Sequence, residues 1–405
     1  MGAFDPLETR PDTERQSALK TDLPAQVARA KELPGYAEIL QGIDPETITS
    51  VAALQSLPVL RKSALAELQS AQPPLGGLTT LAATHFEHLF QSPGPIYEPG
   101  RTTENWWRLG RFLAAAGLGT GDVVQNCFGY HLTPAGHMFE NGARAVGATV
   151  IPAGTGQTEL QVQAAAALGA TAYAGTPDYL KVILEKADEQ GVPLAITKAV
   201  VSGGALFPTL RDWYAKRGIT CTQCYATADL GLIAYESPAM EGMIVDEGVV
   251  VEIVTPGTGD PVSEGEVGEV VVTSLNPDYP LLRFATGDLS AVLPGVSPCG
   301  RSNMRIKGWM GRADQTTKIK GMFVRPEQVA ALVTKLENVT RARVIAGREG
   351  EADTMLVRVE GDAVETGQVS EAVRDVLKLS GVIEVVAPGS LPRDGVVIED
   401  TRSYD

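Results

Sequence analysis

The sequence contains little of what a secreted, membrane-spanning or nucleic-acid-binding protein needs. It has four cysteines in 405 residues, too few and too scattered for a disulfide framework, so we expect reduced thiols. No run approaches 18 apolar residues, and residues 1–20 are polar and acidic, so we expect neither a membrane span nor a secretion signal. Only 34 Lys and Arg stand against 49 Asp and Glu, and the net charge of −15 repels the phosphates of nucleic acid. These absences favour a cytoplasmic protein without a membrane or nucleic-acid partner.

Residues that could hold a metal are also scarce. Cys221 and Cys224 have the two-residue gap of half a zinc site, but no second close pair of Cys or His accompanies them, so buried strand cysteines are the favoured interpretation. His85 and His88 could share a helix face, yet no carboxylate or third His stands at ligand spacing. The patterns therefore do not favour a metal centre.

What is present is a long chain with an apolar fraction of 44%, which suits two or three domains. Residues 103–201 alternate between helical and strand patterns. Helices are predicted at 103–116, 135–146, 159–168 and 177–190, and strands at 123–128, 149–152, 171–174 and 199–202. Strands separated by helices of this length pair in parallel through right-handed crossovers. This region is predicted to be a doubly wound α/β layer.

The pattern changes near residue 243. Short β-branched runs at 249–254 and 267–273 flank a Pro and Gly turn at 256–260, which favours antiparallel hairpins and a small β subdomain over about 243–311. Beyond it the predicted order is strand, helix, strand, strand, helix, strand, at 316–319, 326–336, 342–346, 354–360, 367–378 and 382–386. That order fits a small α+β (ferredoxin-like) module. We place the domain boundary at Gly311 to Asp314, which gives domains of 1–311 and 312–405.

Several segments combine glycines with chemically active side chains. Residues 91–100 are rich in Gly and Pro and contain a hydroxyl, as an anion-binding loop can be, but they lack a P-loop lysine, and an ordinary surface loop is the better interpretation of this segment alone. The turn at Ser202-Gly203-Gly204-Ala205 follows a predicted strand, where a ligand ring could lie against backbone. Tight strand-to-helix packing explains that turn equally well.

Three further segments carry ionisable groups in turns. Tyr225 to Asp229 brings a hydroxyl and an acid together after a strand, which suits phosphate and Mg²⁺, although a helix cap is an equal alternative. Residues 283–289 and 311–314 place Arg and Asp beside glycines, where Asp can accept hydrogen bonds from ribose hydroxyls and Arg can pair with phosphate. Each segment alone is weak evidence.

Taken in order, these segments resemble the serial motifs of the adenylate-forming (acyl-CoA synthetase) superfamily, and the chain looks most like its phenylacetate–CoA ligase branch. The likeness extends through residues 130–140, 150–156, 311–321 and 391–400, from about Gln91 to the C-terminus. The resemblance implies a large N-terminal domain that binds ATP and a carboxylic acid, and a small mobile C-terminal domain. It also implies a two-step reaction, in which the acid attacks the α-phosphate of ATP and the thiol of coenzyme A then displaces AMP.

Residue by residue, the resemblance implies a nucleotide site. Thr227 would meet the α-phosphate, Asp229 takes the place of the usual Mg²⁺-binding Glu, and Arg312 would approach the nucleotide. The implied cofactor-binding positions are Ser92, Gly94 and Tyr97 in the phosphate loop, Gly203, Gly204 and Ala205 beside adenine, Tyr225 stacked on it, Ala226, Asp288 on the ribose hydroxyls, and Lys320. The implied acyl-pocket wall holds Tyr130, His131, Pro134, Gly136 and Phe139, and Asp314 would be the hinge.

The sequence departs from the family pattern at the phosphate loop, which lacks its usual lysine, at Asp229, which is one methylene shorter than Glu, and at Val396. Val396 occupies the position of the mobile catalytic lysine. Losing that ammonium would cost on the order of 3 kcal/mol in the adenylation step, whereas thioester formation uses the other domain orientation. We therefore expect slow adenylation and normal binding of ATP or AMP.

Many relatives of this branch hold a structural metal with several Cys and one His. Cys299 could be a remnant of that site, but Ser237 and Ser297 stand where partners are expected, so we expect no zinc. The favoured function is an AMP-forming ligase joining a small, aromatic or branched, carboxylic acid to coenzyme A. The alternatives are acyl transfer to another acceptor, and a degenerate relative that binds nucleotide or acyl-CoA with weak adenylation. Dimers are common in the branch.

Overall fold

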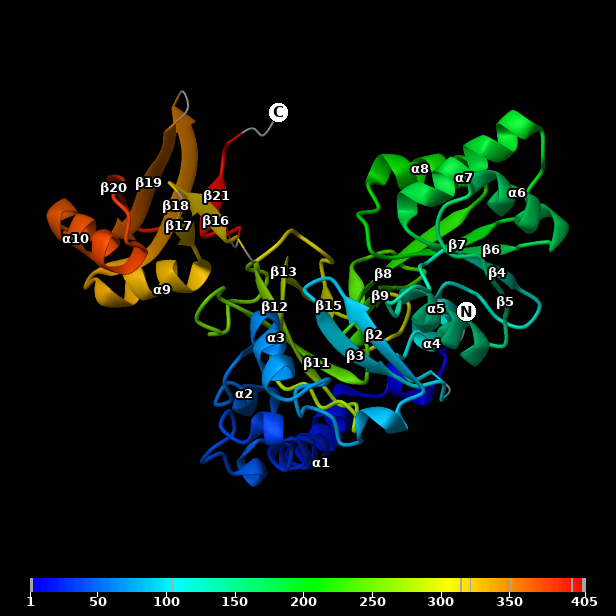
Figure 1. Cartoon of the computed structure of the whole chain (residues 1–405), viewed down its shortest axis with the longest axis horizontal. Helices are drawn as coiled ribbons and strands as arrows, with labels where there is room; N and C mark the ends of the chain where they lie inside the picture. The colour runs from blue at the N-terminus through cyan, green and yellow to red at the C-terminus, as the bar shows by residue number, and fades with distance from the viewer. Residues whose placement is uncertain are drawn as a thin grey trace. The chain divides into compact units, whose positions relative to one another are not determined.

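The structure is a computed structural model that describes residues 3–103, 105–313, 315–320, 322–349, 352–394 and 396–402 (Figure 1). The chain divides into two compact units. The first comprises Met1–Val251, Val272–Phe284 and Leu293–Trp309, and the second Glu252–Val271, Ala285–Val292 and Met310–Asp405. The boundary predicted at 311–312 stays a prediction. Among the described residues, no helix combines the length and apolar character that crossing a membrane requires.

A nine-stranded sheet forms the centre of the first unit, with the order β14-β15-β10-β9-β8-β7-β6-β4-β5. Five adjacent strands pair in parallel: β4 (Val123–Asn126), β5 (Thr149–Pro152), β6 (Ala172–Gly175), β7 (Lys198–Val201) and β8 (Thr220–Thr227). The remaining strands are antiparallel or lie at the edge: β9 (Gly231–Glu236), β10 (Met243–Val245), β15 (Arg305–Ile306) and β14 (Val292–Leu293). The predicted parallel pairing is confirmed.

Helices cover both faces of the parallel strands (Figure 1). One face packs on α4 (Gly110–Ala115) and α5 (Ala135–Ala145), and the other on α6 (Thr158–Ala167), α7 (Pro177–Gln190) and α8 (Pro208–Lys216). The alternation of strand side chains shows this, because Ala172 and Ala174 join the first core cluster while Tyr173, between them, joins the second. The doubly wound α/β fold class is therefore confirmed. Cys221 and Cys224 are buried strand residues, as predicted.

The predicted helix at 103–116 is wrong over its first half. Asn105 and Arg108 have positive φ values of 55° and 69°, which no helix interior accepts. The side chain of Asn105 instead accepts a hydrogen bond from the backbone N–H of Gly110 at 2.7 Å, and α4 begins there. The predicted end is right, since Gly117 follows α4 with a φ of 79°.

The segment predicted as a β subdomain divides between two sheets. β10 and β15 extend the nine-stranded sheet, whereas β11 (Val249–Val254), β12 (Gly268–Ser274) and β13 (Phe284–Ser290) form a four-stranded sheet with β1 (Leu60–Arg61) in the order β1-β13-β12-β11.

The N-terminal segment, which carries no predicted element, is mostly helical. It contains η1 (Pro6–Thr9), α1 (Asp12–Lys31), η2 (Pro34–Tyr36), η3 (Pro45–Thr47), α2 (Val51–Leu54), α3 (Lys62–Ala71) and η4 (Ala83–His85). An antiparallel hairpin follows, formed by β2 (His88–Ser92) and β3 (Ile96–Gly100), with Ser92 opposite Ile96. This hairpin contains the segment predicted to be the phosphate loop.

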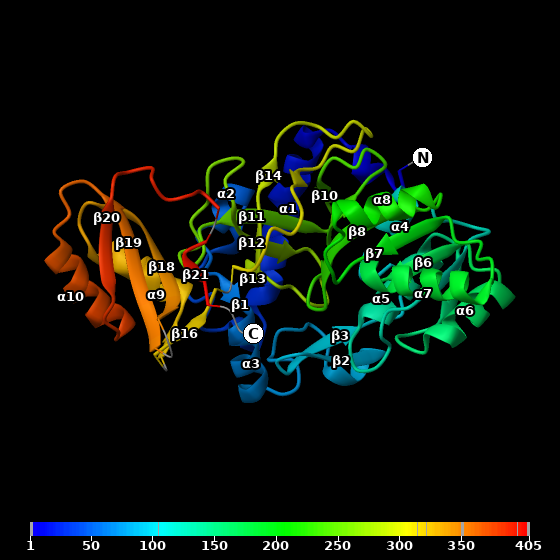
Figure 2. The same ribbon diagram turned by 90° about the horizontal axis from the view of Figure 1, so that it is seen from above.

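In the second unit, α9 (Pro326–Lys335) and α10 (Thr366–Leu377) pack on a four-stranded sheet of order β20-β19-β18-β21 (Figure 2). Its strands are β18 (Val339–Glu349), β19 (Ala352–Gly361), β20 (Val382–Val386) and β21 (Ile398–Asp400). The strand predicted at 316–319 is not part of this sheet. It is β16 (Thr317–Ile319), which pairs with β17 (Met322–Val324) because the chain turns back directly after it, and β21 occupies the sheet edge beside β18.

Candidate functional site

The turn after β7 presents three small residues at the carboxyl ends of the parallel strands. Gly203, Gly204 and Ala205 are exposed, and Gly203 has a φ of 71°. The Ser202 hydroxyl donates a hydrogen bond to the carbonyl of Cys224 at 3.0 Å, which ties this turn to β8. The turn therefore offers bare backbone beside β8, at the edge where ligands bind in such sheets.

The turn between β8 and β9 fixes the next predicted residues. Tyr225 is buried, Ala226 and Thr227 are half-buried, and the Thr227 hydroxyl oxygen accepts a hydrogen bond from the N–H of Leu230 at 3.2 Å. Gly231 has a φ of 72°, and a Cβ at this position would lie 2.8 Å from the carbonyl oxygen of Trp107. Because only glycine fits there, the turn holds Asp229 in one place.

Asp229 forms an ion pair that sequence reasoning missed. One carboxylate oxygen, Oδ2, accepts a hydrogen bond from Nζ of Lys62, the first residue of α3, at 2.9 Å. The Asp229 side chain is 1% exposed and the Lys62 side chain 38% exposed. The other oxygen, Oδ1, is buried without a partner among the described residues. No sequence pattern connects Lys62 with a motif 167 residues away.

A second buried carboxylate lies near this pair. Glu98 on β3 is fully buried; its Oε1 accepts a hydrogen bond from the Ser92 hydroxyl, while Oε2 has no partner among the described residues. Burial, followed by the charge of Asp229, raises the pKa of Glu98 to about 7, and the Ser92 hydrogen bond and the Lys62 charge oppose this rise. The Ser92 hydroxyl is thus engaged by Glu98.

Tyr279 completes the group, which we call the Asp229 cluster: Lys62, Ser92, Glu98, Asp229 and Tyr279. The Tyr279 hydroxyl is buried and has no partner within the described part of the chain. Its pKa is raised well above the ordinary value by burial and then by the charges of Asp229 and Glu98. Three buried oxygen atoms in one cluster therefore lack a hydrogen-bond partner, which natural structures rarely leave without a reason.

The Asp229 cluster fits magnesium only in part. Carboxylate oxygens are its preferred donors, and Mg²⁺ is commonly held by one or two carboxylates together with substrate phosphates. The unpartnered Oδ1 of Asp229 suits that role. Over the described ranges, no group of three or more His, Cys, Asp and Glu could hold a metal. Mg²⁺ would therefore need phosphate oxygens as further ligands.

The rest of the predicted phosphate loop forms the exposed end of the hairpin. Gly94 is exposed between β2 and β3, and the Tyr97 side chain is also exposed. The backbone of Tyr97 is held by the side-chain amide of Gln69 on α3, through hydrogen bonds of 2.9 and 2.7 Å. The helix that begins with Lys62 thus also anchors the hairpin.

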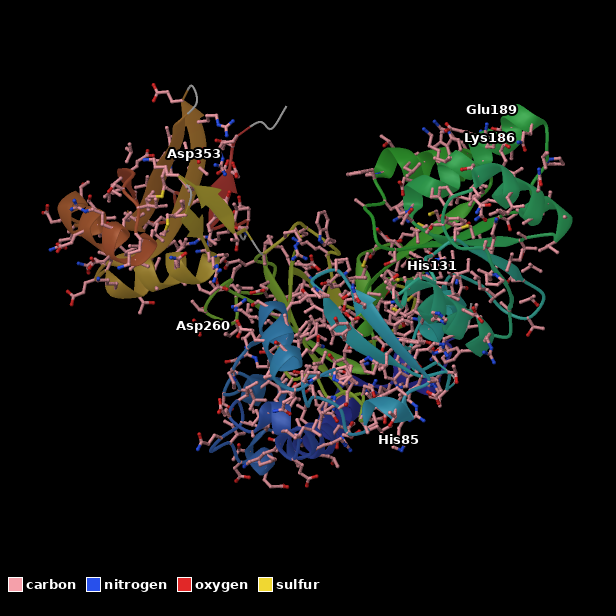
Figure 3. The ribbon with its side chains drawn as sticks, in the orientation of Figure 1. His85, His131, Lys186, Glu189, Asp260 and Asp353 are labelled. Atoms are coloured by element: carbon pink, nitrogen blue, oxygen red, sulfur yellow. The ribbon has the colours of Figure 1, made fainter. Side chains whose placement is uncertain are left out.

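The predicted acyl wall comprises residues of the loop after β4 and of the first half of α5. The Tyr130 hydroxyl accepts a hydrogen bond from Asn126 at 2.7 Å. Gly136 must be small, because a Cβ there would lie 2.8 Å from the Tyr130 ring. Pro134 and Phe139 are buried, whereas His131 is exposed (Figure 3).

Another histidine, His137, lies within the segment 130–140 that carries the resemblance, although it is not among the named wall residues. The ring of His137 lies 5.1 Å from that of Tyr130 and 4.5 Å from that of His88. Burial and the neighbouring His88 lower the pKa of His137, which favours its neutral form. Its place one turn into α5 could have been inferred from the predicted helix.

The predicted residues of the second unit form a separate arrangement. The Arg312 guanidinium lies 3.0 Å from Oδ1 of Asp288, and the two residues form an isolated β-bridge. A Cβ at Gly287, where φ is 74°, would lie 2.9 Å from the Arg312 side chain, so glycine permits this contact. Asp288 and Arg312 are therefore brought together. The predicted hinge residue, Asp314, lies outside the described residues.

Lys320 and Val396 lie elsewhere in the second unit. The Lys320 ammonium donates to the carbonyl of Ser380 at 3.3 Å. Val396 is half-buried, and its N–H donates to the carboxylate of Asp394 at 3.0 Å. Asp394 in turn pairs with Arg343. No ammonium stands at position 396 itself.

Cys299 lies among polar side chains of the first unit. Its Sγ is 3.1 Å from the Ser297 hydroxyl and 3.7 Å from a nitrogen of Arg301. Burial raises the pKa of this thiol, but hydrogen bonds from Ser237, Ser297 and Arg301 outweigh burial and lower the pKa to about 7. The two serines singled out in the sequence thus interact with the sulfur.

Comparisons with known proteins show which proteins the chain is similar to. Residues 130–276 match the family model described as AMP-binding enzyme. The chain is 27% identical to the phenylacetate-coenzyme A ligase of Thermus thermophilus, with 96% of each chain covered, and 26% identical to that of Escherichia coli, with 96% and 95% covered.

Solved structures give the same result for the fold. A 2-hydroxyisobutyryl-CoA ligase in the postadenylation state, in complex with R3-HIB-AMP, is 25% identical with a TM-score of 0.72, covering 98% of this chain and 91% of that chain. An open conformation of that ligase with 2-HIB-AMP and CoA is 24% identical, also with a TM-score of 0.72, covering 95% and 90%. The predicted resemblance to the adenylate-forming superfamily and its phenylacetate–CoA ligase branch is confirmed.

Proposed function

We propose that this chain, a relative of the adenylate-forming enzymes that resembles phenylacetate–CoA ligases, is an ATP-dependent, AMP-forming acid–CoA ligase. The observation that supports this most is the Asp229 cluster at the end of β8, with unpartnered buried oxygens beside a lysine. The names of the curated relatives and the acyl-adenylate and CoA in the similar solved structure support the same reaction. Its reactants would be ATP, a carboxylic acid and coenzyme A.

In the first half-reaction, the acid's carboxylate oxygen bonds to the α-phosphorus of ATP as the bond to pyrophosphate breaks. Negative charge then accumulates on the phosphate oxygens, so positioned donors and cations accelerate the step. The Thr227 hydroxyl and Asp229 stand at the strand end where we place that phosphate. Bound Mg²⁺ would supply a Lewis acid there, held by Asp229 and phosphate oxygens.

The remaining predicted residues would hold the rest of the nucleotide. We assign adenine to Gly203, Gly204 and Ala205 with Tyr225, and the ribose hydroxyls to Asp288, whose carboxylate Arg312 already orients at 3.0 Å. In the second half-reaction, the thiolate of coenzyme A bonds to the acyl carbon and AMP leaves. The hinge at Asp314 and the mobility of residues 312–405 belong to this proposal.

We further propose that adenylation is the slower half-reaction, because Val396 occupies the position of the mobile lysine. The side chain cannot donate a hydrogen bond or carry a charge. A Val396→Lys variant should raise acid-dependent pyrophosphate release about a hundredfold. An unchanged rate would show that this position was misassigned.

The acid is proposed to be small and aromatic. Tyr130 and His137 present aromatic rings 5.1 Å apart beside the predicted wall, and such rings favour a flat apolar ligand. The cytoplasmic location and the homodimer expected from the sequence remain predictions.

A screen of carboxylic acids with ATP and Mg²⁺, with and without coenzyme A, tests the function. We expect pyrophosphate release with at least one small aromatic acid, and AMP and thioester release that require coenzyme A. AMP release without coenzyme A would favour another acyl acceptor. Nucleotide binding without pyrophosphate release for any acid would favour the degenerate relative.

A further inference from the structure

We propose that Lys62 contacts the α-phosphate during adenylation and supplies the positive charge that the chain lacks at position 396. This inference rests on the proposed function. It is drawn from the residues around Asp229, because Lys62 lies in none of the segments that carry the family resemblance.

The geometry places a partly free ammonium beside a buried carboxylate. Lys62 Nζ lies 2.9 Å from Asp229 Oδ2, and its ammonium donates no other hydrogen bond within the described chain. An ammonium has three donors, so two remain for a ligand. The Lys62 side chain is 38% exposed, so a ligand can reach its ammonium from solvent, whereas the Asp229 side chain is 1% exposed.

The charges of the cluster explain why a cation is needed there. Asp229 and Glu98 are both buried acids, and each would repel the phosphates of a nucleotide when it is ionised. Residues 92–97 of the hairpin contain neither Lys nor Arg, so the predicted phosphate loop offers no cation. Lys62 is the cation that lowers the pKa of Glu98, which shows that its field reaches this part of the cluster.

A purely structural ion pair would leave a different pattern. Such a pair neutralises a buried acid, and both oxygens of the carboxylate then have hydrogen-bond partners. Here Asp229 Oδ1, Glu98 Oε2 and the Tyr279 hydroxyl all lack partners among the described residues. The unsatisfied atoms indicate that the cluster is completed by a ligand and its counter-ions.

The test compares Lys62→Met with Lys62→Arg and with a matched control, Lys198→Met. Lys198 also lies 2.9 Å from an aspartate, Asp122, and is 32% exposed, but it stands at the opposite end of the parallel strands, at the start of β7. Calorimetry measures the affinities for AMP and for adenosine, and a loss for AMP alone indicates that the substituted side chain contacts the phosphate. Acid-dependent exchange of labelled pyrophosphate into ATP measures adenylation, and thioester formation from supplied acyl-adenylate measures the second half-reaction.

We expect Lys62→Met to weaken AMP binding about ten- to hundredfold and to leave adenosine binding unchanged. Exchange should fall at least about a hundredfold, thioester formation should change less than a few-fold, and Lys62→Arg should restore part of the AMP affinity. Lys198→Met should leave the affinities for AMP and for adenosine unchanged.

Two results overturn the inference alone: wild-type AMP affinity in Lys62→Met, or an equal loss for AMP and adenosine. A wild-type protein that binds no AMP and catalyses no exchange with any acid would instead overturn the proposed function, and the inference with it. Thermal unfolding of each variant distinguishes a lost contact from a lost fold.

Discussion

Two groups of buried carboxylates in the first unit differ in how completely their oxygens are hydrogen-bonded. In the first group, which we call the arginine-paired acids, Glu8, Asp246 and Glu247 have a partner for every carboxylate oxygen. Their partners include Arg10, Arg15, Arg108, Arg111 and Arg301. Bidentate and multiple arginine contacts of this kind repay the cost of burying charge.

The Asp229 cluster contains two buried acids but one partly exposed lysine and no arginine. Three buried oxygens of this cluster have no hydrogen-bond partner among the described residues: Asp229 Oδ1, Glu98 Oε2 and the Tyr279 hydroxyl. The two groups therefore differ in whether their buried carboxylate oxygens all have hydrogen-bond partners within the described chain. The arginine-paired acids stabilise the N-terminal segment against β9 and β10, while the Asp229 cluster keeps unsatisfied groups for a charged ligand.

The largest expected effect is a difference in stability between two isosteric substitutions. Asp246→Asn leaves the buried Arg108 and Arg111 without their common carboxylate and should lower the free energy of unfolding by about 3–5 kcal/mol. Asp229→Asn frees a lysine that water can reach and relieves repulsion with Glu98, so its loss should stay within about 1 kcal/mol. Urea unfolding measures both.

The exposed pair between Arg217 and Asp188 provides the control for this comparison. Its aspartate is 56% exposed, so Asp188→Asn should change stability by less than about 1 kcal/mol. Equal losses for Asp246→Asn and Asp229→Asn would remove the proposed distinction between the two groups.

The next effect concerns the pH dependence of stability in the absence of nucleotide. The pKa of Glu98 is about 7 in the folded chain and near 4.5 ordinarily, so folding favours its protonated form. This contribution is fully present below pH about 4.5 and is lost as pH rises through 7, a change of about 3 kcal/mol. Glu98→Gln cannot ionise and should flatten the fall in unfolding free energy between these pH values. The same slope in both proteins would contradict the assigned burial of a proton on Glu98.

The smallest expected effect concerns the thiol pKa of Cys299, whose sulfur lies beside Arg301, one of the arginines that pair with the buried acids. Cys299 has a pKa of about 7, whereas burial raises the pKa of Cys127, Cys221 and Cys224 to about 12. Iodoacetamide should therefore label Cys299 with a midpoint near pH 7, and Ser297→Ala should move the midpoint upward by about one unit. Labelling that is equally slow at all four thiols would contradict the hydrogen-bonded thiol.

Much of the fold follows from local patterns, but little of the Asp229 cluster does. The helix at 177–190 is predicted to the residue, because Pro177 and Gly191 mark its ends and the apolar period is regular. The helix at 103–116 fails at Asn105, whose side chain accepts from the N–H of Gly110, and at Arg108, whose side chain pairs with the distant Asp246. The order of the motifs carries the family resemblance, which implies the roles of Thr227 and Asp229, and these roles stay predictions.

Their partners could not be identified in that way. Lys62 and Glu98 reach Asp229 from α3 and β3, and these contacts depend on tertiary packing between segments far apart in the chain. A lone lysine at the start of a helix has the same sequence appearance as any exposed lysine. Only the ion pair and the unsatisfied oxygens distinguish it.

The central claim is that the Asp229 cluster binds the phosphates of ATP for adenylation. Acid-dependent exchange of labelled pyrophosphate into ATP, measured for the wild type and for Asp229→Asn, tests it most directly. The account predicts exchange with at least one carboxylic acid in the wild type and a loss of at least about a hundredfold in the variant, at nearly unchanged stability. Exchange at the same rate in both proteins, or in neither with any acid, would contradict it.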